Sequence, residues 1–165
     1  MERTDIITDI ETTGLDPLKD RSTALGIEIG EGQLIFNEDD ERFNLHSYWQ
    51  FLRKHQYFRL IGFEIGFDVR FLVIRSLLHK VKIVDVMGKT IDLRQVLSFG
   101  NKYEKGTLND YSKFLGFGEK YNGFIGAHAT ILWQDGKKDE LKKYLSKDLE
   151  LTWKVYHRCK HIGLL

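Results

Sequence analysis

Apolar runs place strands along the first half of the chain. Residues 4–10 form one stretch of β character, and residues 24–29 with 33–36 predict a hairpin. Short apolar runs at 60–63 and 82–86 predict two further strands. Strands at the beginning, followed by alternating helix and strand, indicate a mixed sheet with helices packed on it.

Apolar residues at helical spacing predict helices between and after these strands. Phe67, Phe71 and Ile74 recur at steps of four and three, which defines one face of a helix over residues 67–78. Asp92 is expected to cap the helix that begins beside it. The remaining predicted helices cover residues 40–55, 92–99, 107–115, 127–133 and 138–159.

Length and composition describe one domain without a strong charge bias. The 165 residues are 42% hydrophobic, so residues 1–165 are expected to form a single domain around one core. A net charge of +1 means that any surface that binds nucleic acid must be local. The single cysteine, Cys159, excludes an intrachain disulfide. Without a signal peptide or a membrane span, an intracellular, cytoplasmic protein with no membrane contact is expected.

Two carboxylates, Asp9 and Glu11, stand one residue apart at the end of the first predicted strand. Residues i and i+2 of a strand face the same way. Two like charges at this distance destabilise each other unless a cation lies between them, so the pair is interpreted as half of a metal site. The pair taken alone has another explanation, since such triplets arise by chance and Asp9 alone can cap a turn.

The last predicted helix carries an acidic residue on its inward face. Leu141, Tyr144, Leu145 and Asp148 follow the three-four spacing of that face. A carboxylate there is unfavourable unless it has a partner. Tyr144 lies one turn before Asp148, so its hydroxyl projects from the same side, although an ordinary half-buried aromatic residue fits the position as well.

Three motifs in order resemble those of a known enzyme family. They are Asp9-x-Glu11-Thr12-Thr13-Gly14-Leu15, the pair Phe67-Asp68, and Tyr144-x-x-x-Asp148, with a lysine instead of histidine at position 143. The chain resembles the tyrosine subclass of the DEDD superfamily of 3′–5′ exonucleases. Within that group it is similar to the proofreading exonuclease domain of family-B DNA polymerases.

The resemblance implies a ribonuclease H-like α/β fold, with a mixed five-stranded sheet flanked by helices. It implies that Asp9, Glu11, Asp68 and Asp148 hold two divalent ions, and that Tyr144 orients the attacking water. Four carboxylates form an all-oxygen site, which suits Mg²⁺ or Mn²⁺ better than zinc. Asp68 has a second explanation as an acidic residue favourable at the start of a helix.

The resemblance also implies residues that contact substrate. The turn Thr12, Thr13, Gly14 and Leu15 is expected to hold the terminal nucleotide, with Phe67 beside it; a permissive turn and a core leucine are the alternatives. Relatives commonly carry an amide where this chain has Glu64. This acid either adds a metal ligand, or repels phosphate, or faces solvent. Lys143 and Lys147 are the preferred phosphate contacts, although lysine runs usually form a solvated face.

The expected function is hydrolysis of DNA, preferably single-stranded, from its 3′ end to 5′-mononucleotides. DNA is favoured over RNA only by the resemblance to polymerase domains. An exoribonuclease that trims RNA is one alternative, and a catalytically weak subunit that binds nucleic acid or supports assembly is another. A protein partner from replication or repair is a further expectation.

Overall fold

A computed structural model describes residues 3–30, 32–101, 103, 106–121 and 126–165. Five strands form one sheet in the order β3-β2-β1-β4-β5. Their bounds are Thr4–Thr12 for β1, Ser22–Ile29 for β2, Gly32–Phe36 for β3, Phe58–Gly62 for β4 and Thr90–Asp92 for β5. Strands β1, β2 and β3 pair antiparallel, whereas β4 lies parallel to both β1 and β5. The predicted mixed sheet and its hairpin are confirmed.

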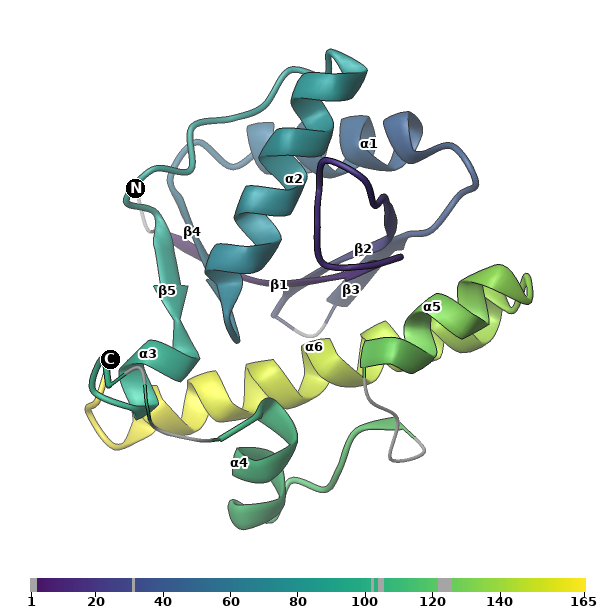
Figure 1. The fold of residues 1–165 in the computed structure, drawn as a ribbon. Coiled ribbons are helices and arrows are strands. Elements are labelled where there is room, and N and C mark those ends of the chain that lie inside the picture. The colour runs from purple at the N-terminus through teal and green to yellow at the C-terminus, as the bar shows by residue number, and fades with distance from the viewer. Residues whose placement is uncertain (1–2, 31, 102, 104–105, 122–125) are drawn as a thin grey trace.

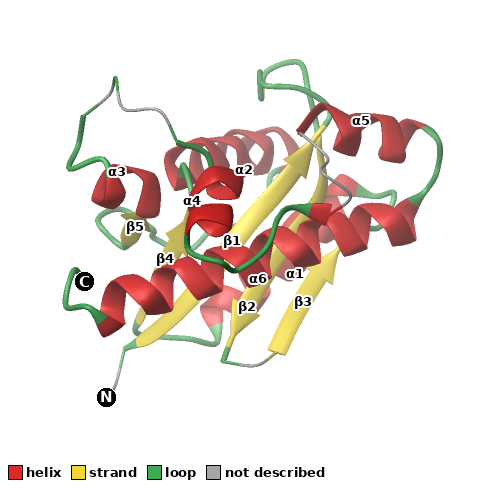
Figure 2. Cartoon of the chain, turned by 90° about the horizontal axis from the view of Figure 1, so that it is seen from below, coloured by secondary structure: helices red, strands yellow, loops and turns green. Residues whose placement is uncertain are grey.

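Helices cover both faces of this sheet (Figures 1 and 2). Helices α1 and α2 cover one face, where their apolar side chains pack with Ile6, Ile10, Leu25 and Leu60. Helices α4, α5 and α6 cover the other face and enclose Ile7, Ala24 and Ile61. The helices are α1 (Glu41–Arg53), α2 (Ile65–His79), α3 (Leu93–Leu97), α4 (Leu108–Phe114), α5 (Gly126–Gln134) and α6 (Lys138–His161).

The prediction of a strand over residues 82–86 is wrong. Ile83 is exposed and Val86 is buried, but the segment forms no ladder and ends at a turn in which Asp85 accepts a hydrogen bond from the amide of Met87. The position beside β4 is taken by β5, where Thr90 pairs with Leu60. An apolar run at a sheet edge is not sufficient to make a strand, because the neighbouring strand must also be free to pair with it.

Helix α6 lies close to the sheet because β2 has a glycine beneath it. Gly26 pairs with Asp9 of β1. A Cβ atom at Gly26 would come within 2.8 Å of Leu149 Cδ1 and 3.1 Å of Leu145 Cγ. The missing side chain therefore allows α6 to approach the middle of the sheet, directly beside the strand that carries Asp9.

A buried ion pair joins the two helices of the opposite face to β2. The Glu41 carboxylate accepts hydrogen bonds from the Arg75 guanidinium at 2.6 and 2.9 Å, from Ser22, and from His79 Nε2 at 2.8 Å. Arg75 also donates to the carbonyl of Pro17 at 3.3 Å, in the loop after β1. The network thereby holds that loop in place.

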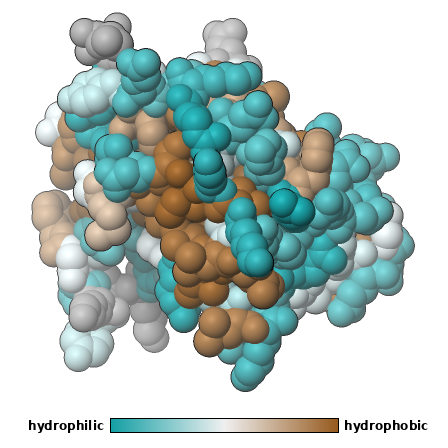
Figure 3. Space-filling view, turned by 90° about the horizontal axis from the view of Figure 1, so that it is seen from above, coloured by the Kyte–Doolittle hydropathy of each residue, from teal (hydrophilic) through white to brown (hydrophobic). Residues whose placement is uncertain are grey.

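Hydrophobic side chains gather on the outer surface of the layer that contains α1 and α2 (Figure 3). Leu77 and Leu78, near the end of α2, are both largely exposed.

Of the helices that the structure describes, none combines the length and apolar character needed to cross a membrane.

We expect Gly26→Ala to lower the stability of the fold and to displace α6. Overpacking a well-packed contact costs about 1–3 kcal/mol, and Leu149 must move to accept the methyl group. Chemical denaturation measures the loss. Gly66→Ala is the matched control, because a Cβ atom there would meet no other group within 4 Å. Equal stability of Gly26→Ala and wild type would contradict the close packing described above.

We expect Glu41→Gln to lower the free energy of unfolding by about 3 kcal/mol at neutral pH, because it leaves the Arg75 guanidinium buried without a carboxylate. Burial alone would raise the pKa of Glu41, but Arg75, the Ser22 amide and His79 hold it below its ordinary value of 4.5. The stabilisation is therefore complete above pH 4.5 and is lost as pH falls through the lowered pKa. Denaturation curves across this range should show wild type and variant converging in acid, with exposed Glu38→Gln as the control.

Candidate metal centre and cleft

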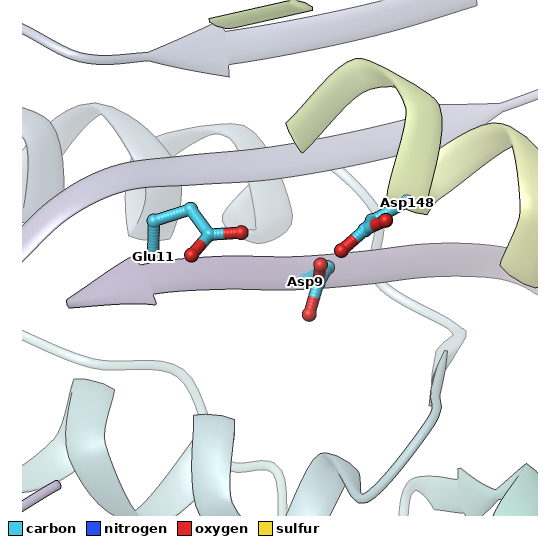
Figure 4. Close-up of side chains that lie close together, drawn as sticks. All are labelled: Asp9, Glu11 and Asp148. Atoms are coloured by element: carbon cyan, nitrogen blue, oxygen red, sulfur yellow. The ribbon is translucent and has the colours of Figure 1, made fainter. Parts of the chain in front are cut away.

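Three carboxylates from two elements meet on one side of the sheet. Asp9 and Glu11 project from β1, and Asp148 projects from α6 toward Asp9 (Figure 4). One oxygen atom from each of the three lies within 4.8 Å of the others. The strand period of two and the close approach of α6 at Gly26 together produce this arrangement.

The carboxylates destabilise one another in their charged forms. Burial, followed by the charge of Asp148, raises the pKa of Asp9 to about 7. Burial and the neighbouring acids, Asp9 foremost, raise the pKa of Glu11 and of Asp68 well above their ordinary values. The pKa of Asp148 is raised by burial. Within the described part of the chain, too little positive charge contacts these acids to balance four ionised groups.

Asp68 stands in the first turn of α2, close enough to Asp9 for their charges to interact, but outside the group of three. Two oxygen atoms, Asp68 Oδ2 and Asp148 Oδ1, are buried and accept no hydrogen bond from the described residues. Buried acceptors without partners, in an all-oxygen set, fit a hard divalent cation such as Mg²⁺ or Mn²⁺. The donor set thus agrees with a metal site.

Tyr144 lines the same cleft as the carboxylates and is almost fully buried. It lies one helical turn before Asp148 on α6, as the spacing predicts. Burial, followed by the charges of Asp148 and Glu11, raises the pKa of the Tyr144 hydroxyl above its ordinary value. At neutral pH the hydroxyl is therefore protonated, so it can donate a hydrogen bond but is not a base.

Lys120 is a functional candidate that sequence reasoning missed. Its Nζ lies 2.5 Å from Asp148 Oδ2 and 5.5 Å from the centre of the Tyr144 ring. Its backbone amide donates to Asn109 Oδ1 of α4 at 2.9 Å. Burial alone would lower the pKa of Lys120, but the charges of Asp148, Tyr144 and Asp9 raise it. No motif or periodicity marks this lysine, because it stands outside the described helices, beyond the end of α4 at Phe114.

The carboxylates lie in a cleft of about 1110 Å³, which exceeds the roughly 300–1,000 Å³ that is usual for small-molecule sites. Among the predicted substrate contacts, Thr12, Gly14, Leu15, Glu64 and Phe67 line it. Leu15 is 80% exposed, so it is not a core leucine.

Three predicted contacts have other surroundings. The described lining of the cleft includes neither Lys143 nor Lys147, and Lys147 pairs with Glu150 at 3.0 Å. Thr13 supports the turn, since its amide donates to the carbonyl of Arg21 and its hydroxyl accepts from the amide of Arg21. Substrate contact by these three residues stays a prediction.

Glu64 precedes α2 with a left-handed backbone and an exposed side chain. Its carboxylate forms an ion pair with the guanidinium of Arg94 on α3, which also lines the cleft. It lies outside the group of three carboxylates that can share a metal. Glu64 therefore has a cationic partner rather than facing solvent alone.

Comparison with known proteins agrees with this fold. A family model described as RNase_H superfamily matches residues 6–159. The chain belongs to the ribonuclease H superfamily. Membership supports a nuclease, and thus a hydrolase, with the divalent metals that ribonuclease H-like nucleases use.

One curated protein and one solved structure are similar to nearly the whole of this chain. An uncharacterized protein of Methanocaldococcus jannaschii is 37% identical, over 96% of this chain and 97% of its own length. The family B DNA polymerase of Pyrobaculum calidifontis superposes with a TM-score of 0.82 at 20% identity, over 96% of this chain. This chain spans 25% of that polymerase chain, so the likeness establishes the ribonuclease H-like fold.

We expect Mn²⁺ or Mg²⁺ to raise the melting temperature, because a cation that binds the folded state adds about 2.7 kcal/mol at 100 times its dissociation constant. Asp9→Asn should abolish the shift and should stabilise the metal-free protein, since it removes repulsion from Asp148. Thermal scans with and without metal measure both effects. Asp139→Asn, an exposed acid on α6, is the matched control. An equal shift in Asp9→Asn would place the ion elsewhere.

Proposed function

We propose that this protein is a tyrosine-type, metal-dependent 3′–5′ exonuclease that releases 5′-mononucleotides from DNA, with single strands preferred. One observation carries the proposal: carboxylate oxygens of Asp9, Glu11 and Asp148 lie within 4.8 Å of one another in an open cleft. Superfamily membership supports phosphodiester hydrolysis, and the three motifs in their order support this subclass.

The carboxylates would hold the catalytic ions. Asp9, Glu11 and Asp148 would hold one ion, and Asp68 with Asp9 would help to hold a second. Divalent Mg²⁺ or Mn²⁺ at these residues would supply an activated water and charge stabilisation for the leaving 3′ oxygen. Buried acceptors on Asp68 and Asp148 are consistent with this role, since they accept no hydrogen bond from the described residues.

Tyr144 and Lys120 act on the reacting groups by position and charge. The protonated Tyr144 hydroxyl donates a hydrogen bond to the attacking water and orients it toward phosphorus. Lys120, held between Asp148 and the Tyr144 ring, keeps a positive charge near the reacting phosphate. A fixed charge in a largely buried position stabilises the negative charge that develops on the phosphate oxygens.

The turn after β1 would receive the 3′ terminal nucleotide. Thr12 Oγ1 donates to the carbonyl of Gly14 at 2.6 Å, and a Cβ atom at Gly14 would clash with the Asp20 carboxylate at 2.4 Å. This tight turn presents the exposed Leu15 to the cleft, where it can pack against the terminal base. Backbone groups of the turn are assigned to the free 3′ hydroxyl.

We expect Asp148→Ala to abolish hydrolysis and Tyr144→Phe to slow it by about 10²-fold, the scale of one catalytic polar contact. The difference follows from their roles, because Asp148 is a metal ligand whereas Tyr144 contributes one hydrogen bond. Single-turnover rates on end-labelled single-stranded DNA measure both. Tyr57→Phe, an exposed tyrosine outside the cleft, is the matched control. Equal rates for Tyr144→Phe and wild type would remove the tyrosine from the mechanism.

We expect a bulky 3′ blocking group to stop digestion, because the turn at Gly14 and Leu15 binds a free 3′ end. Chromatography of the products should show 5′-mononucleotides. Parallel assays with RNA of the same sequence determine the sugar preference, and faster digestion of RNA would identify an exoribonuclease. Cleavage of circular single-stranded DNA would contradict exonuclease polarity.

A further inference from the structure

The described lining of the cleft carries six carboxylates and two cations. The acids are Asp9, Glu11, Glu64, Asp68, Asp92 and Asp148, and the cations are Arg94 and Lys120. When all are ionised, the excess of four negative charges equals the charge of two divalent ions. With two ions bound, the described lining is therefore close to neutral overall, so it attracts a polyanion through local cations, namely the ions and individual cationic side chains, rather than through a net field.

Of these two cations, Arg94 is the one whose side chain can contact substrate outside the group of Asp9, Glu11 and Asp148. Lys120 is largely buried against Asp148. Arg94 is 37% exposed, and its partner Glu64 is 56% exposed. Ion pairs with this exposure are weak, so a phosphate can displace the Glu64 carboxylate from the guanidinium. Arginine suits this exchange, because its planar fork binds phosphate and carboxylate with the same geometry.

Asp92 fixes both members of this pair at the wall of the cleft. Asp92 Oδ1 accepts hydrogen bonds from the backbone amides of Glu64 and Arg94, each at 3.0 Å. The beginnings of α2 and α3 are thereby joined, and the two side chains meet across them. Glu64 keeps a left-handed backbone, with φ of 64°, in this arrangement. The pair is thus a preformed unit outside the group of Asp9, Glu11 and Asp148.

We propose that Arg94 binds the backbone phosphate one step 5′ of the scissile phosphodiester, and that Glu64 occupies Arg94 until that phosphate arrives. This inference rests on the proposed exonuclease function. The scissile phosphate belongs beside Asp9, Glu11 and Asp148, so a cation on the cleft wall outside that group meets the next phosphate along the strand. The preferred substrates are therefore linear oligonucleotides with a charged linkage on the 5′ side of the one that is cut.

The test compares two thymidine pentanucleotides. One has phosphodiester linkages throughout, and the other has a neutral methylphosphonate at the linkage one step 5′ of the first scissile bond. Release of the first 3′ nucleotide is measured with Mn²⁺ over a range of substrate concentrations. For wild type, kcat/KM should be about tenfold higher on the charged oligonucleotide, which is the scale of one charged hydrogen-bonded contact. The difference should arise from a lower KM, with kcat unchanged.

Arg94→Gln should reduce that preference to less than about twofold, on the scale of residual long-range attraction. Binding of the charged oligonucleotide by Arg94→Gln should also depend less on salt. The slope of the logarithm of the association constant against the logarithm of the salt concentration should become shallower by about 0.7, as expected for one lost phosphate contact. Glu64→Gln should lower KM for the charged oligonucleotide by about threefold, since a surface pair competes only weakly. Arg42→Gln, an exposed arginine outside the cleft, is the matched control and should keep the wild-type preference.

Binding of both oligonucleotides in Ca²⁺, followed by fluorescence anisotropy, separates the two hypotheses. If wild type cuts neither oligonucleotide, the exonuclease proposal fails, whereas the Ca²⁺ binding data still decide the role of Arg94. If Arg94→Gln keeps the wild-type preference for the charged oligonucleotide, Arg94 does not contact this phosphate. An equal loss on both oligonucleotides would assign Arg94 a structural role and overturn the inference.

Discussion

The contact between α6 and β2 at Gly26 is the constraint on which the candidate site depends. Asp9 faces Gly26 across the ladder, and the missing side chain there lets Leu145 and Leu149 approach the sheet. Asp148, the neighbour of Leu149, is thereby placed within reach of Asp9. A contact between two apolar side chains and a glycine thus determines the distance between two carboxylates. Because core packing tolerates little change in volume, this distance is held firmly.

The electrostatics of the site oppose the stability of the metal-free fold. Burial raises the pKa of all four acids, and repulsion from neighbouring carboxylates raises it further for Asp9, Glu11 and Asp68. Lys120 acts against this chiefly at Asp148. On the opposite face of the sheet, the buried carboxylate of Glu41 is paired with Arg75. Unbalanced acids in one place and balanced acids in another indicate that the first group is arranged for a ligand rather than for the fold.

Recognition of nucleic acid by this chain would be local rather than global. The net charge of +1 and the acidic lining of the cleft provide no broad field that attracts a polyanion. Affinity must then come from ions held by Asp9 and its neighbours, from apolar contacts such as Leu15, and from individual cations. Local recognition of this kind is compatible with the proposed action at the end of a strand.

The sequence by itself determined most of the elements and the faces on which their acidic residues lie. The two-residue repeat of a strand placed Asp9 and Glu11 on one side, and the spacing of a helical turn placed Tyr144 and Asp148 on one face. Both relations could be predicted because they are local in sequence. The hairpin and the cap at Asp92 followed from local signals in the same way. The edge strand could not be predicted in this way. Residues 90–92, rather than 82–86, pair with β4, and this pairing depends on a strand that is distant in sequence. The positions of Lys120 beside Asp148 and of Arg94 beside Glu64 were likewise decided only by tertiary structure, which brings together residues 28 and 30 positions apart.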